Sequence, residues 1–190
     1  MAYTFSNQLP IGFTAPDFQL PDVVSGEIRS LQELKSDSAT VILFICNHCP
    51  YVKHVNKGIA ELANDYRAKG VAFIAISAND AEAFPDDAPE FLKKQAIEHG
   101  FNFPYLYDET QQVAKAYKAA CTPDFYVFNK ALKLEYHGRM DEANHKNNAP
   151  NDGKDIRNAL DKVIKGQPAD NLQTPSSGCN IKWKAGVSPF

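Results

Sequence analysis

The chain has 190 residues, a length that suits one domain with a substantial hydrophobic core. Apolar residues make up 44% of it and charged residues 23%, and the net charge is -3 with the basic residues scattered. This composition is ordinary for a globular protein in water, and it gives no electrostatic basis for a nucleic-acid partner.

The N-terminal segment, residues 1–13, has neither a positively charged start nor a continuous apolar stretch, so no secretory signal is expected. The longest apolar runs, near residues 41–46 and 71–76, have the length of strands and are too short to span a bilayer. We therefore expect a cytoplasmic protein without a membrane partner. Four cysteines are too few for a disulfide scaffold, and in a reducing compartment they point to catalysis or metal binding.

The first part of the chain predicts a hairpin followed by a buried strand. Residues 16–29 alternate apolar and polar side chains around a Ser-Gly turn, as two short paired strands do. Ser30 with Glu33 three residues later predicts a capped helical turn. Residues 40–46 are apolar throughout, which is typical of a strand covered on both faces of a parallel sheet.

The remaining elements alternate helices and strands before a final hairpin and helix. In chain order, the patterns predict a helix from Cys49 to Gly70, a buried strand over 71–76, a helix from Asp87 and Pro89 to Gly100, a short strand over 104–107, a helix after an Asp108–Gln111 capping box, a hairpin over 125–128 and 132–136, an exposed loop over 139–153, and a closing helix from Ile156 to Ile164.

This order is a β-hairpin, then β-α-β-α-β-α, then β-β-α. The two crossovers imply parallel pairing, and the final hairpin adds antiparallel strands. The sequence therefore predicts an α/β fold with a mixed central sheet and helices on both faces. Residues 1–166 are expected to form this domain, and residues 167–190, rich in Pro, Ser and Gly, to form a C-terminal extension.

The most informative motif is Cys46-Asn47-His48-Cys49-Pro50, which connects the first long buried strand to a helix. A helix N-terminus stabilises a thiolate, the form in which cysteine attacks disulfides. Cys46, where the strand ends, is expected to be the more exposed and more acidic thiol, and Cys49 to resolve the mixed disulfide. A charged His48 between them would favour the thiolate.

The element order, this motif, and Thr122-Pro123 before the terminal hairpin resemble the thioredoxin superfamily. Residues 15–18, 46–50 and 121–125 more closely resemble its redoxin branch, the alkyl hydroperoxide reductase/thiol-specific antioxidant type. The resemblance implies a thioredoxin-like three-layer α/β/α fold with an added N-terminal β-hairpin, and it implies no cofactor. It also implies a cis bond at Pro123 beside the cysteine pair, with Thr122 offering its backbone to substrate.

The other two cysteines leave alternatives open. Cys121 would lie near the site, either as a core thiol or as an additional redox partner. Cys179, in the tail, could fold back as a further resolving thiol or be inert.

The strand entering the motif lacks the buried carboxylate with which thioredoxins accept a proton from the second cysteine. Lys53 and Asp124 are the candidates to replace it. Asp86 and Asp87 are expected to be solvated loop acids.

Three functions fit these patterns. The first is a thiol–disulfide oxidoreductase that uses Cys46 and Cys49, a disulfide substrate and a thiol reductant. The second is a peroxiredoxin-like peroxidase acting on hydroperoxides. Two observations count against it: Cys46 stands where the Pro-x-x-x-Thr-x-x-Cys signature has Thr, and the sequence does not place the distant Arg139 relative to the cysteines. The third is a non-catalytic module that binds partners or metal. Zinc is disfavoured because there is no second Cys-x-x-Cys, although His48 and His54 could add ligands.

Overall fold

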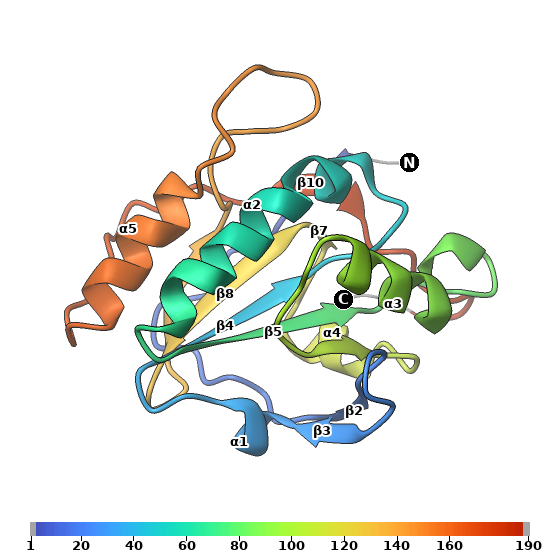
Figure 1. Ribbon diagram of the computed structural model, residues 1–190, viewed down its shortest axis with the longest axis horizontal. Coiled ribbons are helices and arrows are strands. Elements are labelled where there is room, and N and C mark those ends of the chain that lie inside the picture. The colour runs from blue at the N-terminus through green and yellow to red at the C-terminus, as the bar shows by residue number, and fades with distance from the viewer. Residues whose placement is uncertain (1–2, 188–190) are drawn as a thin grey trace.

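The computed structural model describes residues 3–187 of the chain (Figure 1). Within them the central sheet has the strand order β6-β5-β4-β8-β9. β4 is parallel to β5 and β5 to β6, whereas β8 is antiparallel to β4 and β9. The predicted mixed sheet is therefore confirmed. The strands are β4 Ala39–Phe44, β5 Val71–Ser77, β6 Tyr105–Tyr107, β8 Asp124–Asn129 and β9 Leu134–Gly138.

Helices cover both faces of this sheet. Along β4, Val41 and Leu43 join one buried cluster, while Ile42 and Phe44 join the other, as the alternation of a doubly covered strand requires. The first cluster includes side chains of α2 Pro50–Arg67, α3 Pro89–Glu98 and α5 Lys154–Val163. The second includes Leu31 of α1 Leu31–Leu34 and Ala114 of α4 Gln112–Ala116.

Helix α2 carries the motif at its N-terminus. Pro50 occupies the first helical turn, where its missing N–H costs nothing, and Gly70 with a φ of 79° follows the C-terminus. Tyr66 near the end of α2 donates a hydrogen bond to Asp161 of α5 (2.7 Å), and Figure 1 shows these two helices side by side over the sheet. The inward face of α2 repeats at helical spacing through Val52, Val55, Ile59, Leu62 and Tyr66.

The N-terminal hairpin is confirmed as β2 Gln19–Pro21 paired with β3 Ile28–Ser30. Ser30 caps α1, since its hydroxyl accepts the Glu33 N–H at 3.2 Å. A 3₁₀ turn, η1 Pro85–Asp87, precedes α3.

A small sheet that the sequence patterns did not predict joins the two ends of the chain. It contains β1 Tyr3–Phe5, β10 Ser177–Asn180 and β7 Cys121–Thr122 in the order β1-β10-β7. These strands are too short to show a period of their own, and β10 is made of small and polar residues. The division of the chain at residue 166 stays a prediction.

The capping box predicted at Asp108 and Gln111 is only half right. Asp108 accepts the Ala114 N–H at 2.8 Å, but Gln111 adopts a left-handed conformation with a φ of 62°. Its side-chain amide instead donates to the carbonyls of Ala78 (2.6 Å) and Lys182 (2.8 Å). Gln111 thus holds the tail, and Trp183 packs against the second core cluster.

Among the described residues, no helix is both long enough and apolar enough to cross a membrane.

Candidate active site

The motif loop places both of its cysteines against Thr122. β4 ends at Phe44, and Cys49 is the N-cap of α2. Cys46 Sγ lies 3.3 Å from the Thr122 hydroxyl, and Cys49 Sγ lies 3.4 Å from the Thr122 carbonyl oxygen. The Thr122–Pro123 bond is cis, which confirms the prediction.

The expectation that Cys46 is the more exposed and more acidic thiol is wrong. Both thiols are fully buried. Burial raises the pKa of Cys46 well above its usual value, and its hydrogen bond to Cys49 and the charge of Asp87 raise it further. The apolar run predicted that the strand ends at Cys46, but β4 ends at Phe44. The loop that follows carries Cys46 into the interior and leaves Cys49 at the N-terminus of α2.

The surroundings of the pair favour the thiolate at Cys49 over Cys46. The hydrogen bond from the Cys46 thiol is the largest cause, and with a smaller contribution from Cys179 it lowers the pKa of Cys49 to about 5 against the effect of burial. The Val52 N–H of the first helical turn also contributes, although the geometry is not that of a regular cap bond. The hydrogen bond from Cys49 to the Thr122 carbonyl requires the protonated thiol and therefore opposes ionisation. The contacts from Cys46, Cys179 and Val52 favour the Cys49 thiolate.

Replacing Cys46 by alanine is expected to raise the pKa of Cys49, because the largest cause of its low value is the Cys46 thiol. The thiolate would then form only at higher pH. Ultraviolet thiolate absorbance, followed as the reduced protein is titrated, measures this shift. Cys46→Ser, which keeps a hydroxyl donor, should shift the pKa less. An unchanged titration in Cys46→Ala would show that Cys46 does not stabilise the thiolate.

A buried carboxylate holds the motif loop, and it comes from Asp87, one of the acids predicted to be solvated. That prediction is wrong: Asp87 is fully buried. One carboxylate oxygen accepts the backbone N–H groups of Asn47 (2.8 Å) and His48 (3.0 Å). The other contacts the His48 ring Nδ1 and accepts a hydrogen bond from Asn79 at 2.8 Å. Burial raises the pKa of Asp87, but these hydrogen bonds together hold it below its usual value.

Asp87 is also a buried carboxylate near the cysteine pair, which the strand entering the motif lacks. A ring nitrogen of His48 and a carboxylate oxygen of Asp87 lie within 4.8 Å of Cys46 Sγ and of each other. This pair can accept the proton of Cys46. The Asp87 carboxylate comes from the 3₁₀ turn before α3 and not from the strand entering the motif. The residues of that strand therefore gave no sign of it.

The two acceptors proposed from the sequence do not fit as well. Lys53 is exposed on α2. Asp124 is fully buried, but its oxygens bind the His137 ring at 3.1 and 3.2 Å and accept the Tyr126 hydroxyl at 2.9 Å. Asp124 is therefore already paired on the side of the sheet away from the motif loop.

Cys46, His48 and Asp87 together offer a thiolate, an imidazole and a carboxylate, which are ligand types that zinc accepts. The Nε2 atom of His48 is buried without a hydrogen-bond partner. The carboxylate of Asp87, however, is already engaged by four donors from the loop and Asn79. These residues could hold a metal only if those bonds were partly given up.

The remaining cysteines lie at the neighbouring small sheet. In the β10–β7 pairing, Cys179 is opposite Thr122 and Asn180 is opposite Cys121. Cys179 shares a buried cluster with Cys46 and Cys49, whereas Cys121 is not part of it. Burial raises the pKa of Cys121 far above its usual range, as expected of a core thiol.

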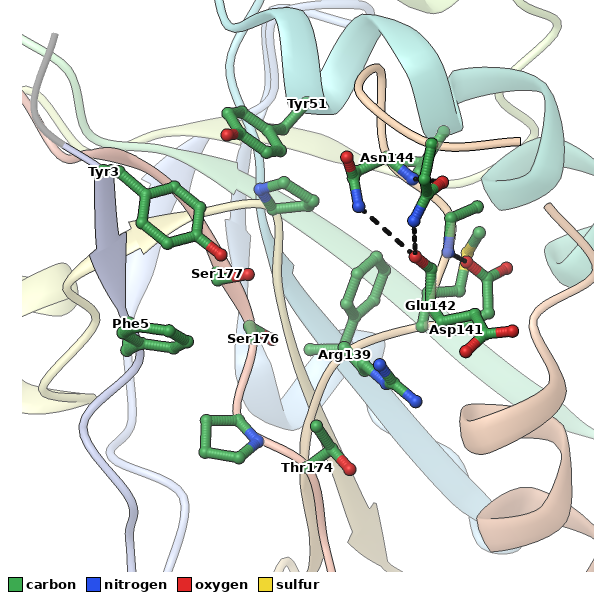
Figure 2. A pocket seen from close by; sticks show the side chains of 17 residues that line it. Tyr3, Phe5, Tyr51, Arg139, Asp141, Glu142, Asn144, Thr174, Ser176 and Ser177 are labelled. Carbon is green, nitrogen blue, oxygen red and sulfur yellow. Dashed lines mark hydrogen bonds between the residues drawn. The ribbon is translucent and has the colours of Figure 1, made fainter. Parts of the chain in front are cut away.

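Two cavities adjoin the site. The larger, about 370 Å³, is lined by Pro123, Tyr51 and Arg139 among others, but by none of the cysteines. Figure 2 shows Tyr3 and Phe5 on one side of it and Arg139 on the other. The guanidinium of Arg139 is paired with Asp155 at 2.6 Å. The smaller cavity, about 180 Å³, is lined by Cys179 and lies beside Pro50 and Tyr51.

Comparison with known proteins agrees with this geometry. The AhpC/TSA family model matches residues 11–137, and the chain belongs to this family, whose members are thiol-dependent oxidoreductases and peroxidases. No curated protein matches the chain.

Solved structures extend the match over the whole chain. An uncharacterized conserved protein from Geobacillus kaustophilus is 54% identical, with a TM-score of 0.96 over 98% of this chain and 99% of its own. A hypothetical protein from Sinorhizobium meliloti is 44% identical, with a TM-score of 0.93 over 96% and 100%. The thioredoxin domain of a thiol-disulfide oxidoreductase from Bacteroides vulgatus is 17% identical, with a TM-score of 0.60 over 79% and 97%. The thioredoxin-like fold is therefore confirmed.

Proposed function

We propose that the protein is a thiol–disulfide oxidoreductase in which Cys49 is the nucleophile and Cys46 the resolving thiol. The observation that carries this is the convergence of both sulfurs on Thr122, at 3.3 and 3.4 Å, with Cys49 at the N-terminus of α2. The helix terminus and the neighbouring thiols favour a thiolate at Cys49 near neutral pH.

The reaction has two exchange steps. The Cys49 thiolate attacks one sulfur of the substrate disulfide, forming a mixed disulfide, and the other substrate sulfur leaves as a thiolate that takes up a proton. Cys46 then gives its proton to the His48–Asp87 pair and attacks Cys49 Sγ. The second substrate sulfur is released, and a Cys46–Cys49 disulfide remains. The substrate gains two electrons, which a thiol reductant later returns to the protein.

Redox titration with peptide mapping tests this proposal. The tryptic peptide of residues 36–53 contains both motif cysteines, so their disulfide forms within one peptide. The reduced protein is equilibrated in glutathione buffers of rising potential, alkylated and digested. A reversible loss of two hydrogens from this peptide is expected. If the peptide stays reduced and zinc co-purifies in stoichiometric amount, the chain is a binding module instead.

A peroxidase remains the second candidate because the family includes peroxidases and Cys49 is an acidic thiol at a helix N-terminus. Against it, Arg139 pairs with Asp155 and lines a cavity that contains no cysteine. Rapid consumption of hydrogen peroxide at low concentration, lost in Cys49→Ser, would favour this candidate over disulfide reduction.

A further inference from the structure

The tail strand β10 occupies the edge of β7 beside the motif. Its register sets Cys179 opposite Thr122, the residue that both motif sulfurs contact. The approach is close, because a Cβ atom added at Gly178 would lie 2.1 Å from the Thr122 carbonyl oxygen. Glycine at this position therefore lets the tail carry a cysteine to the place where a substrate strand would pair.

Cys179 is the third member of a compact thiol cluster. It packs in the same buried cluster as Cys46 and Cys49, and β10 contacts α2, which begins immediately after Cys49. The Cys179 thiol also interacts with the Cys49 sulfur and helps to stabilise its thiolate. Cys121 lies on the adjacent strand, opposite Asn180, and is outside this cluster.

Of these three thiols, Cys179 is the one nearest to solvent. It lines the cavity of about 180 Å³ together with Tyr51 and Lys146, and it is 3% exposed, whereas Cys46 and Cys49 are 0% exposed. The ammonium group of Lys146 lies 5.6 Å from the centre of the Tyr51 ring. A small thiol entering this cavity would therefore meet Cys179 before the motif pair.

We propose that Cys179 is a third redox-active cysteine, which takes over the disulfide from the motif pair by exchange at Cys49. This relay rests on the proposed function, since it starts from the Cys46–Cys49 disulfide. It moves the oxidised bond from the motif pair to a sulfur whose residue lines the cavity of about 180 Å³.

The exchange needs no additional oxidant. Cys179 loses its proton and attacks Cys49 Sγ, so that the Cys49–Cys179 bond forms as the Cys46–Cys49 bond breaks. Cys46 leaves as a thiolate and takes up a proton, with the His48–Asp87 pair within 4.8 Å to deliver it. One thiol of the reductant then attacks Cys179 and releases Cys49. A second thiol attacks that mixed disulfide, and the reductant leaves as its own disulfide.

In the reduced protein Cys179 is held as a thiol. Burial is the largest cause, and together with the hydrogen bond to Cys49 and the charge of Cys49 it raises the pKa of Cys179 to about 12. The two contributions from Cys49 disappear once Cys49 is in a disulfide and carries no charge. Deprotonation of Cys179 is therefore easier in the oxidised state, in which the relay requires it.

The Cys46→Ser variant isolates the proposed bond. After equilibration in a glutathione redox buffer, blocking of free thiols and tryptic digestion, a Cys49–Cys179 disulfide joins the peptide of residues 36–53 to that of residues 166–182. We expect this cross-linked pair in Cys46→Ser and equally in Cys46→Ser/Cys121→Ser. In Cys46→Ser/Cys179→Ser this pair cannot form, because the peptide of residues 166–182 then has no cysteine, and a glutathione adduct on Cys49 is expected instead.

Gly178→Ala in the Cys46→Ser background keeps all the remaining thiols but displaces the tail from Thr122. It should reduce the cross-link, while Gly178→Ala alone should still form the Cys46–Cys49 disulfide. This variant keeps the test informative if removing two cysteines at once disturbs folding.

Failure of the relay and failure of the proposed function give different results. If the unmodified protein forms the Cys46–Cys49 disulfide but Cys46→Ser gives only the glutathione adduct, the relay is overturned and the proposed function stands. A cross-link from Cys49 to the peptide of residues 119–130 would likewise overturn the relay, since it would assign the role to Cys121. If the unmodified protein forms neither a disulfide within the peptide of residues 36–53 nor its cross-link to the peptide of residues 166–182, both proposals fail.

Discussion

Cys49→Ser is expected to abolish disulfide reduction, a loss of roughly 10³-fold or more, because a serine hydroxyl is not ionised near neutral pH. Cys46→Ser should also stop turnover, but it should retain the first step and accumulate a mixed disulfide on Cys49. Both changes are best made in a Cys179→Ser background, so that only the motif pair is tested. Mass spectrometry of protein mixed with a peptide disulfide distinguishes the two variants.

Cys121→Ser provides the control for this comparison, since Cys121 is buried outside the thiol cluster and should leave turnover nearly unchanged. A mixed disulfide that forms on Cys46 in Cys49→Ser, and not on Cys49 in Cys46→Ser, would reverse the assigned roles. The sulfur at the strand end would then be the nucleophile, despite its burial and raised pKa.

Asp87→Ala is expected to lower the free energy of unfolding of the reduced protein by about 3–5 kcal/mol. The substitution leaves the backbone N–H groups of Asn47 and His48, and the amide of Asn79, without their buried acceptor. Urea unfolding at neutral pH measures the loss. Asp86→Ala is the matched control because Asp86 is exposed, and its only described contact to the motif is through its backbone carbonyl.

The difference in free energy of unfolding between the unmodified protein and Asp87→Ala depends on pH because the pKa of Asp87 is lowered in the folded protein. A carboxyl group whose folded-state pKa is depressed contributes stability that is complete above its unfolded pKa of about 3.9 and is lost as pH falls through the folded value. The gap between the unmodified protein and Asp87→Ala should therefore stay constant from neutral pH to about pH 5 and narrow only in stronger acid. A gap that closes between pH 7 and 5 would assign the stabilising role to a different group.

The parts of the fold that the sequence predicted share long, repetitive patterns. The continuous apolar strands β4 and β5, the spacing of buried residues in α2 and α5, and the turn between β8 and β9 all satisfy local rules. The strands of the small sheet escaped prediction because each has two to four residues. Their pairing depends on contacts between positions 3–5, 121–122 and 177–180, far apart along the chain.

The same distinction applies to the candidate site. The motif, Thr122 and Pro123 were recognised because the type of residue and its place between predicted elements are local information. The ionisation of the two thiols was predicted in the wrong order because a pKa depends on burial and on neighbours from other segments. Asp87 was misjudged for the same reason, since nothing in its own segment shows that its carboxylate faces the motif loop.

By itself, the sequence determined that this chain forms a mixed α/β sheet with a cysteine pair at a strand-to-helix junction. Hydrophobic periodicity and turn residues act over a few positions and are therefore legible in order along the chain. Only the tertiary structure decided which thiol has the surroundings that lower its pKa, which carboxylate holds the motif loop, and that the tail brings Cys179 to Cys49. Those outcomes depend on the distance and burial of charges and thiols, which the folded chain sets between residues as far apart as 49 and 179.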